Sequence, residues 1–196
     1  MRIIIRQFDS LVRWANGVFE FCDDPEGLLR LQVAHAPHAL DLSDGTHVCT
    51  GERVLLLHLW NEHVPPLRPG GSDLAWAAQL GRRLVQSMHA AGRWLAGQPH
   101  LLGVQAVGGV TVLIALGDER GSRRWMRRLG FDVFPYEGRL GRFGEFWENL
   151  YTWGLMWTFN GASLRQRSLL GLRRAEFWMP AERFVRDYGA EYDASE

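Results

Sequence analysis

Lysine is missing from this sequence, because all 22 of its basic residues are arginine. The chain therefore lacks the residue that forms Schiff bases, and it lacks the lysine that contacts phosphate in a P-loop. Its two cysteines, Cys22 and Cys49, have neither the spacing of a zinc site nor the number needed for a disulfide framework. We expect both to be buried small apolar side chains in a reducing compartment.

Long apolar runs and the common catalytic motifs are missing as well. The longest apolar stretch, residues 150–159, is broken by threonine and glycine and is shorter than the ~20 residues of a membrane span. The apolar run at residues 3–5 is too short for a signal peptide. GxSxG, GxGxxG, P-loop, HExxH and CxxC patterns do not occur. We therefore expect a soluble cytoplasmic protein without a metal site, with peripheral contact at the inner membrane left open.

What is present indicates one globular domain with an uneven distribution of charge. The 196 residues, 46% hydrophobic and 22% charged, are enough for a single core, so we expect one domain over residues 1–196. The formal net charge is zero, but the segment from Arg120 to Arg174 contains eleven arginines and only four acidic residues. That segment is suited to an anionic partner.

The pattern of apolar and turn residues predicts an α/β (α+β) fold, in which a mixed, mainly antiparallel sheet is flanked by helices. Residues 54–57 are apolar on both faces, so their strand should lie inside the sheet. Gly130 should end the helix before it. Strands are expected over 28–34, 39–42, 52–60, 103–116, 131–136 and 173–179, and helices over 7–21, 74–95, 122–129, 143–159 and 180–188.

Polar side chains gather at the end of the strand expected over 52–60. His58 and Glu62 would share a face if the strand continued, and either could act as a general base. Trp60 and Asn61 lie between them as candidate ligand contacts. Two imidazoles and a carboxylate in this segment could also bind a metal, but a fourth ligand is missing. The structural alternative is a buried His58 bonded to the backbone, followed by a solvated turn.

The loop after this strand contains Arg68, Gly70 and Gly71, directly before the long helix. Glycine-rich turns at a helix N-terminus direct backbone amides towards phosphate, so these three residues are candidate ligand contacts. A turn shaped by proline and glycine, and capped by Ser72 or Asp73, explains the same pattern without a ligand.

Arginines cover one side of the helix expected over 122–129. Its apolar face carries Trp125, Met126 and Leu129. The other side has the candidates for anion contact, which are Arg123, Arg124, Arg127 and Arg128. A solvated face would have the same composition, and the functional alternatives are contacts to phosphate, a lipid headgroup or nucleic acid.

The helix expected over 143–159 is apolar on most sides, and Trp147, Tyr151 and Trp157 belong to its aromatic stripe. A core helix would have this composition. So would a helix half-buried in a bilayer interface near the arginines, or one that folds around a hydrophobic ligand. On either functional interpretation these three aromatic residues are candidate ligand contacts.

The element order resembles the Gcn5-related acyltransferase (GNAT) fold, since a long helix follows an inner strand and Leu129-Gly130-Phe131 precedes a later strand. The resemblance covers roughly residues 50–137, is one of fold, and implies acyl-CoA as a ligand. The pyrophosphate loop of that family is a Q/R-x-x-G-x-G/A run at the start of the long helix. This chain has only Arg68-x-Gly70-Gly71 there, which is shorter than the family's pattern.

Several short phrases resemble the YkoP-like domain of bacteria. They are Leu42-Ser43-Asp44-Gly45-Thr46, Gly51-Glu52-Arg53-Val54, His58-Leu59-Trp60-Asn61, Leu129-Gly130-Phe131 and Glu176-Phe177-Trp178-Met179. That domain occurs alone and beside polysaccharide deacetylase domains, so the resemblance implies a cell-envelope context. It implies no established chemistry and assigns no catalytic residue.

Two functions from different classes follow. The first is an accessory domain of envelope lipid or polysaccharide metabolism, which binds a small apolar or anionic ligand, or an anionic membrane surface, through the aromatic and arginine-rich residues. The alternative is an acyl-CoA-dependent acyltransferase with a degenerate pyrophosphate loop at Gly70 and Gly71 and with His58 or Glu62 as the base. Overall neutrality and the absence of a known module disfavour a nucleic-acid partner.

Overall fold

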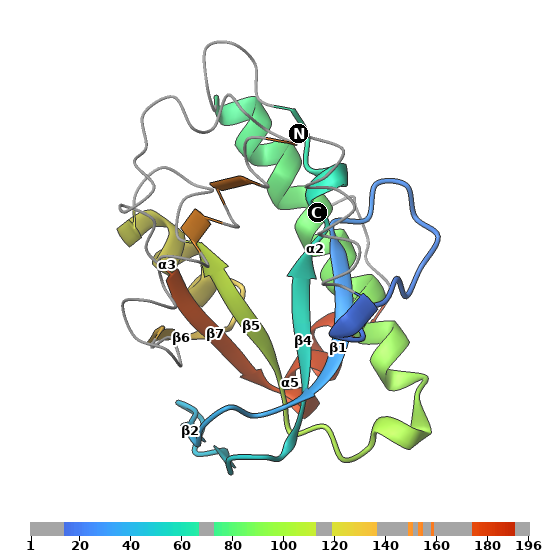
Figure 1. Ribbon diagram of the computed structural model, residues 1–196, viewed down its shortest axis with the longest axis vertical. Helices are drawn as coiled ribbons and strands as arrows, with labels where there is room; N and C mark the ends of the chain where they lie inside the picture. Colours follow the sequence, from blue (N-terminus) through green and yellow to red (C-terminus); the bar gives the residue numbers. More distant parts are fainter. Residues whose placement is uncertain are drawn as a thin grey trace.

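A five-stranded sheet forms the centre of the protein (Figure 1). The computed structural model describes residues 14–66, 73–112, 119–136, 149–150, 153–154, 158 and 174–190. The strands lie in the order β1-β4-β5-β7-β6, with β1 at Leu29–His35, β4 at Arg53–Leu59, β5 at Ala106–Val112, β7 at Arg174–Pro180 and β6 at Asp132–Pro135. Only β4 and β5 are parallel neighbours in this sheet. The expected mixed, mainly antiparallel sheet is confirmed.

The helices α2, α3 and α5 pack against one face of this sheet, and α2 passes behind β1 and β4 in Figure 1. The larger core lies on this face because alternate strand residues, such as Leu55, Leu57 and Val107, point towards Met88 of α2 and Phe184 of α5. The helices are α2 (Leu74–Ala96), α3 (Glu119–Arg128) and α5 (Ala181–Tyr188), and the 3₁₀ turns are η1 (Asn61–His63) and η2 (Pro99–Leu101).

A short hairpin covers part of the opposite face. Its strands, β2 (Leu40–Asp41) and β3 (His47–Val48), pair with each other. Leu40 and Val48 are buried against Val54, Ala106 and Trp178, which form a second, smaller core. The indole of Trp178 lies directly over Gly108, where an added Cβ would come within 2.5 Å of the ring.

The parallel strands β4 and β5 separate from each other. Their paired residues extend only from Val54–Ala106 to Leu56–Gly108, although β4 continues to Leu59 and β5 to Val112. Figure 1 shows the two strands diverging towards their C-terminal ends. At the end where the candidate residues of β4 lie, β4 and β5 are therefore not paired with each other.

Local sequence signals account for most element boundaries. Residues 54–57 do belong to an inner strand, since β4 pairs with β1 on one side and β5 on the other. Asp73 caps α2 by accepting a hydrogen bond from the amide of Trp76. Gly130, with φ of 89°, ends α3 as expected, and an added Cβ there would lie 2.8 Å from Met179.

The helix expected over 7–21 ends earlier than predicted, because residues 14–15 are helical and residues 16–21 are not. Gly17 has a φ of 66° and lies in a turn, and Phe19 then forms an antiparallel bridge with Leu31 of β1. Phe19 therefore lies beside a strand and not on a helix. The expectation that both cysteines are buried is also wrong, because Cys49 is exposed and Cys22 only half-buried.

Candidate functional site

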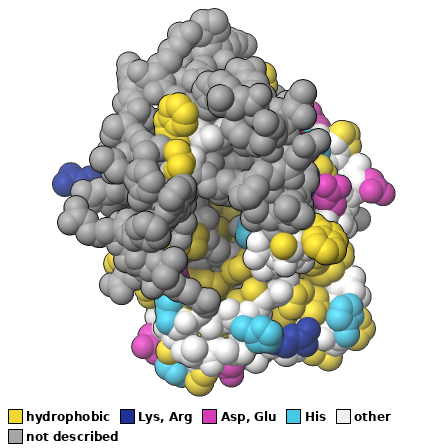
Figure 2. Space-filling view, viewed as in Figure 1, with side chains coloured by type: hydrophobic (Ala, Val, Ile, Leu, Met, Phe, Trp, Pro, Cys, Tyr) yellow, Lys and Arg dark blue, Asp and Glu magenta, His cyan; other side chains and the backbone are white. Residues whose placement is uncertain are grey.

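The open part of the sheet face opposite the helices carries polar and apolar side chains at the divergence of β4 and β5. Side-chain alternation puts His58 on the same face as Leu56 of β4 and as Gly108 and Val110 of β5. Val110 is 47% exposed, which is unusual for a valine in an inner strand. Figure 2 shows this side of the molecule, where apolar side chains reach the surface in the lower half of the view, above histidine side chains.

His58 is half-buried and bonded across the sheet. Its Nε2 lies 2.8 Å from Oε1 of Gln32 on β1. Burial lowers the pKa of the His58 imidazole, so the ring is neutral near pH 7. Its Nδ1 makes no hydrogen bond to any residue within the described ranges.

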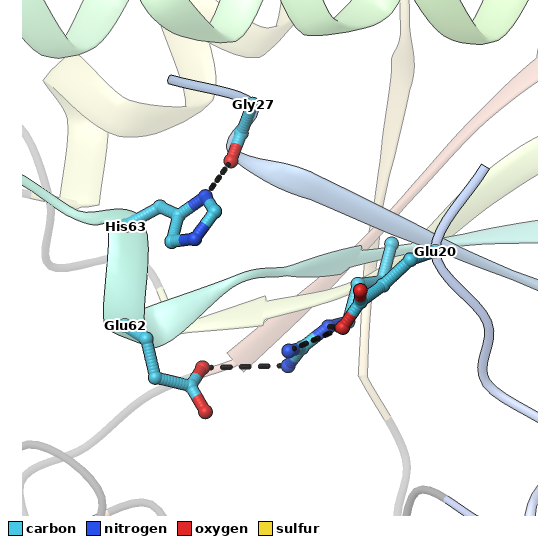
Figure 3. A network of polar contacts seen from close by, with 5 residues as sticks. Glu20, Gly27, Glu62 and His63 are labelled. Carbon is cyan, nitrogen blue, oxygen red and sulfur yellow. Dashed lines mark hydrogen bonds and ion pairs between the residues drawn. The ribbon is translucent and has the colours of Figure 1, made fainter. Parts of the chain in front are cut away.

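Glu62 does not join His58, because its carboxylate is held by Arg30. Arg30 is only 6% exposed, and its guanidinium bonds to Glu62 at 3.3 Å and to Glu20 at 2.9 Å. Figure 3 shows the two carboxylates, of Glu62 and Glu20, on opposite sides of the guanidinium. A buried guanidinium needs such partners, so Glu62 has a structural role that accounts for its position.

The indole ring of Trp60 is in contact with two side chains of the protein. The Arg30 guanidinium lies 4.1 Å from the centre of its ring, and His63 stacks on it at 3.8 Å. His63 in turn donates from Nδ1 to the carbonyl of Gly27 (Figure 3). Trp60 therefore belongs to the Arg30 cluster, and Asn61, which follows it in η1, is half-buried.

The start of α2 is occupied by its own acidic cap. The Asp73 carboxylate accepts from the Trp76 amide at 2.7 Å, so an anion at this helix terminus would lie beside a negative charge. A cavity of about 260 Å³ beside it is lined by Pro65, Trp76 and Arg83 among other residues. The candidate loop residues Arg68, Gly70 and Gly71 lie outside the described residues.

Helix α3 presents arginines to solvent. Met126 is buried in the larger core and Trp125 packs against it, so this face fixes the orientation of the helix. Arg123 is half-buried and has a partner of its own. The exposed side chains are those of Arg120, Arg124, Arg127 and Arg128, and none of them forms an ion pair with an acidic residue in the part of the chain that the structure describes.

Other expected contacts lie beyond the described residues. Trp147, Tyr151 and Trp157 belong to this group. The described residues of the helix expected over 143–159, which are 149–150, 153–154 and 158, are helical, and the Thr158 hydroxyl donates to the Gly154 carbonyl four residues earlier. Within the described ranges, no group of three histidine, cysteine or acidic side chains is arranged to hold a metal ion. No helix in those ranges combines the length and apolar character needed to cross a membrane.

The sequence did not single out Gln32 or Arg30. Both are polar residues in an alternating strand, which is typical of a solvent-facing side. Their contacts depend on the antiparallel register of β1 with β4, in which Arg30 lies opposite His58. Nothing local in the sequence specifies that register, so the partners of His58 and Glu62 could not be named from it.

Comparison with known proteins gives one result. The family model of the YkoP domain matches residues 2–188, which includes the sheet, the helices and every candidate residue above. No curated protein and no solved structure matches the chain. The chain therefore belongs to the YkoP domain family.

Proposed function

We propose that this chain binds an acyl-CoA thioester at the divergence of β4 and β5 and transfers the acyl group to an amine or hydroxyl acceptor. The observation that carries the proposal is the parallel pair that separates after Leu56 and Gly108. The chain order β4-α2-β5-α3-β6-β7, with β7 placed between β5 and β6, supports the likeness to the GNAT arrangement. That likeness concerns fold, so the site residues must carry the chemistry.

The unpaired ends of β4 and β5 suit an extended ligand that contains amides. Past Leu56 and Gly108 no further residues of β4 and β5 are paired, and an arm with amide groups can bond to strand edges as an added strand does. The exposed Val110 offers an apolar contact for the acyl group. His58 is the one imidazole on this part of the face within the described residues, and its ring is half-buried.

The proposed step balances as a simple acyl transfer. The acceptor nitrogen or oxygen attacks the thioester carbonyl, and its proton passes to His58. The new C–N or C–O bond forms, the C–S bond breaks, and the departing thiolate takes the proton from the imidazolium. The products are the acylated acceptor and the free thiol of CoA.

Calorimetric titration with acetyl-CoA tests this proposal. Val110→Trp places a bulky ring at the proposed site and should weaken binding by at least about tenfold, roughly 1.4 kcal/mol. The matched control is Leu102→Trp, because Leu102 is 88% exposed and lies in the loop before β5. An acetyl-CoA affinity that is absent, or that Val110→Trp leaves unchanged, would reject the site.

The acidic cap Asp73 predicts which part of acetyl-CoA supplies most of the binding affinity, and the same titration can test this. Because its carboxylate disfavours pyrophosphate at the start of α2, the pantetheine arm and the acyl group should supply most of the affinity. S-acetylpantetheine, which lacks the pyrophosphate, should therefore bind within about tenfold of acetyl-CoA. A much larger loss would show that the anionic part of CoA dominates and that this account of the start of α2 is wrong.

A second function, as an accessory domain of the cell envelope, is supported by the arginine face of α3. The four exposed arginines, with no acidic partner among the described residues, favour an anionic membrane surface. Each basic side chain near such a surface contributes about 1 kcal/mol, which falls with added salt. On this view the aromatic residues of 143–159 would add apolar contacts to the bilayer.

Vesicle flotation separates this function from the first. Binding to vesicles with phosphatidylglycerol, and not to vesicles of phosphatidylcholine alone, should be weakened in the double variant Arg124→Gln with Arg127→Gln. The control double variant, Arg82→Gln with Arg186→Gln, removes the same charge from exposed positions outside α3 and should bind like the wild type. Equal loss in both doubles would contradict a role specific to α3.

A further inference from the structure

Gln32 and His58 are diagonal neighbours on adjacent strands. In the register of β1 with β4, Gln32 lies opposite Leu56, which is two residues before His58. Residues two apart share a face of the strand, so the Gln32 side chain reaches His58 across the non-helical face of the sheet. The 2.8 Å distance between Oε1 of Gln32 and Nε2 of His58 is that of a good hydrogen bond.

This hydrogen bond fixes the proton on one ring nitrogen. An amide oxygen can only accept, so Nε2 of His58 must donate, and a neutral imidazole then carries its lone pair on Nδ1. Nδ1 has no hydrogen-bond partner within the described part of the chain. The tautomer and the free acceptor are therefore both consequences of one contact.

The charged groups around His58 are engaged elsewhere. Arg30, opposite in the register, is bound by Glu20 and Glu62. On β5 the neighbouring side-chain positions are Gly108 and Val110, which are uncharged. On β7, Glu176 is one strand beyond Val110 and accepts from His38 and Trp178. No carboxylate in the described residues is bonded to His58, so the imidazolium gains no ion pair.

We infer that Gln32 is a positioning residue, which holds His58 as the Nε2–H tautomer and thereby makes Nδ1 the proton acceptor for an uncharged amine or hydroxyl group. The inference rests on the acyl transfer proposed above for its substrate, but the tautomer itself does not. A glutamine partner orients the ring without the charge of a carboxylate. The ring can therefore accept a proton and release it again within one reaction cycle.

The tautomer is measured by NMR of ring nitrogen and carbon shifts in the full chain, with His58→Gln to assign the signals. In the wild type we expect the Nε2–H form of His58. In Gln32→Leu, which removes the acceptor at similar size, we expect a mixture of the two tautomers. A wild-type ring protonated on Nδ1, or an unchanged ring in Gln32→Leu, would overturn the inference.

The effect of Gln32 on catalysis is tested by measuring acyl transfer as a function of pH. Gln32→Leu should lower kcat/KM by roughly 10–100-fold. Gln32→Glu should raise the midpoint of the acidic limb, because a carboxylate at this position stabilises the imidazolium. If transfer occurs but Gln32→Glu leaves that midpoint unchanged, the positioning role fails. If no acyl-CoA binds, the proposed function fails, while the NMR result still decides whether Gln32 sets the tautomer.

Discussion

The guanidinium of Arg30 is a full positive charge placed where only 6% of the residue is exposed. Its three contacts come from two parts of the chain, since Glu20 precedes β1 while Trp60 and Glu62 both follow β4. A charge in this position is tolerated only with partners, because the cost of removing it from water must be offset. The cluster therefore holds the segment before β1 and the turn after β4 against the same side chain.

Removing both carboxylates from Arg30 tests this role. We expect the double variant Glu20→Gln with Glu62→Gln to lose about 2–3 kcal/mol of unfolding free energy, because the buried charge then has no ionic partner. Each single variant should cost only about 1 kcal/mol, since the exposed position of Glu20 and the remaining carboxylate limit the effect. Urea denaturation measures all three, and a double variant that loses less than about 1 kcal/mol would show that Arg30 does not need these partners.

Tyr188 should make the protein sensitive to alkali. Its hydroxyl donates to the carbonyl of Leu129 at 2.8 Å, and burial raises its pKa to about 12. The unfolded chain loses this proton near pH 10, so stability should fall as the pH rises from about 10 to 12. Tyr188→Phe should remove that decline and cost about 1 kcal/mol at pH 7. Thermal unfolding against pH, compared between the two proteins, measures both effects.

At the scale of elements, α2 and α5 approach each other closely at Gly92. A Cβ added there would lie 2.6 Å from the backbone carbonyl carbon of Tyr188 and 2.6 Å from its oxygen. Neither backbone atom can move aside as a flexible side chain would. The absence of a side chain at Gly92 is therefore what lets the C-terminal end of α5 lie on α2.

Two glycines of the same helix give a matched comparison. Gly92→Ala should destabilise the fold by about 2–3 kcal/mol, because α5 must shift and its packing is lost. Gly81→Ala, where no atom lies within 4 Å of the added Cβ, should instead stabilise it by about 0.5–1 kcal/mol. Chemical denaturation of both variants checks the pair, and effects of the same sign would contradict the packing argument.

Whether a strand or helix could be predicted from the sequence depends on whether its signals are local. The strand β4 has its apolar run on both faces at residues 54–57, and α2 has its cap at Asp73, so both carry their signals locally. The segment around Phe19 was predicted as a helix because its apolar spacing fits one, whereas its pairing with Leu31 depends on a distant strand. The two-residue strand β3 is too short to give a period.

The candidate site was predictable only in part for the same reason. Its location at the end of β4 follows from the polar residues after a buried strand, and His58 is there. Its partner Gln32 follows from register, and the divergence of β4 and β5 follows from tertiary packing. Such long-range choices leave no periodic trace in either segment.

At the scale of the whole molecule, two cores of unequal size lie on the two faces of the sheet. The smaller one, under the hairpin of β2 and β3, has fewer buried residues and no helix over it in the described chain. The hairpin is tied to the sheet by the Ser43 amide on Asp132 at 2.8 Å and by His38 on Glu176 at 3.0 Å. This part of the fold should open before the sheet does.

Hydrogen exchange of the native protein tests that order. The amides of Leu42 and Val48 should exchange through a local opening, at a lower free energy than those of Leu55 and Val107. Asp132→Ala should lower protection in the hairpin and leave the inner strands unchanged. The control Asp187→Ala, which removes a surface ion pair on α5, should not affect the hairpin. Equal protection across both cores would mean that the molecule opens as one unit.

The place of β7 in the sheet has a consequence for biosynthesis. β7 is made after β6 but lies between β5 and β6, where it pairs with both. While the ribosome is still producing residues 137–173, a growing chain has neither of those pairings, and the Phe177 and Met179 side chains of the larger core are not yet available. Until β7 has been synthesised, the nascent sheet therefore has unpaired strand edges at β5 and β6. Chaperones can bind the chain during this stage of synthesis.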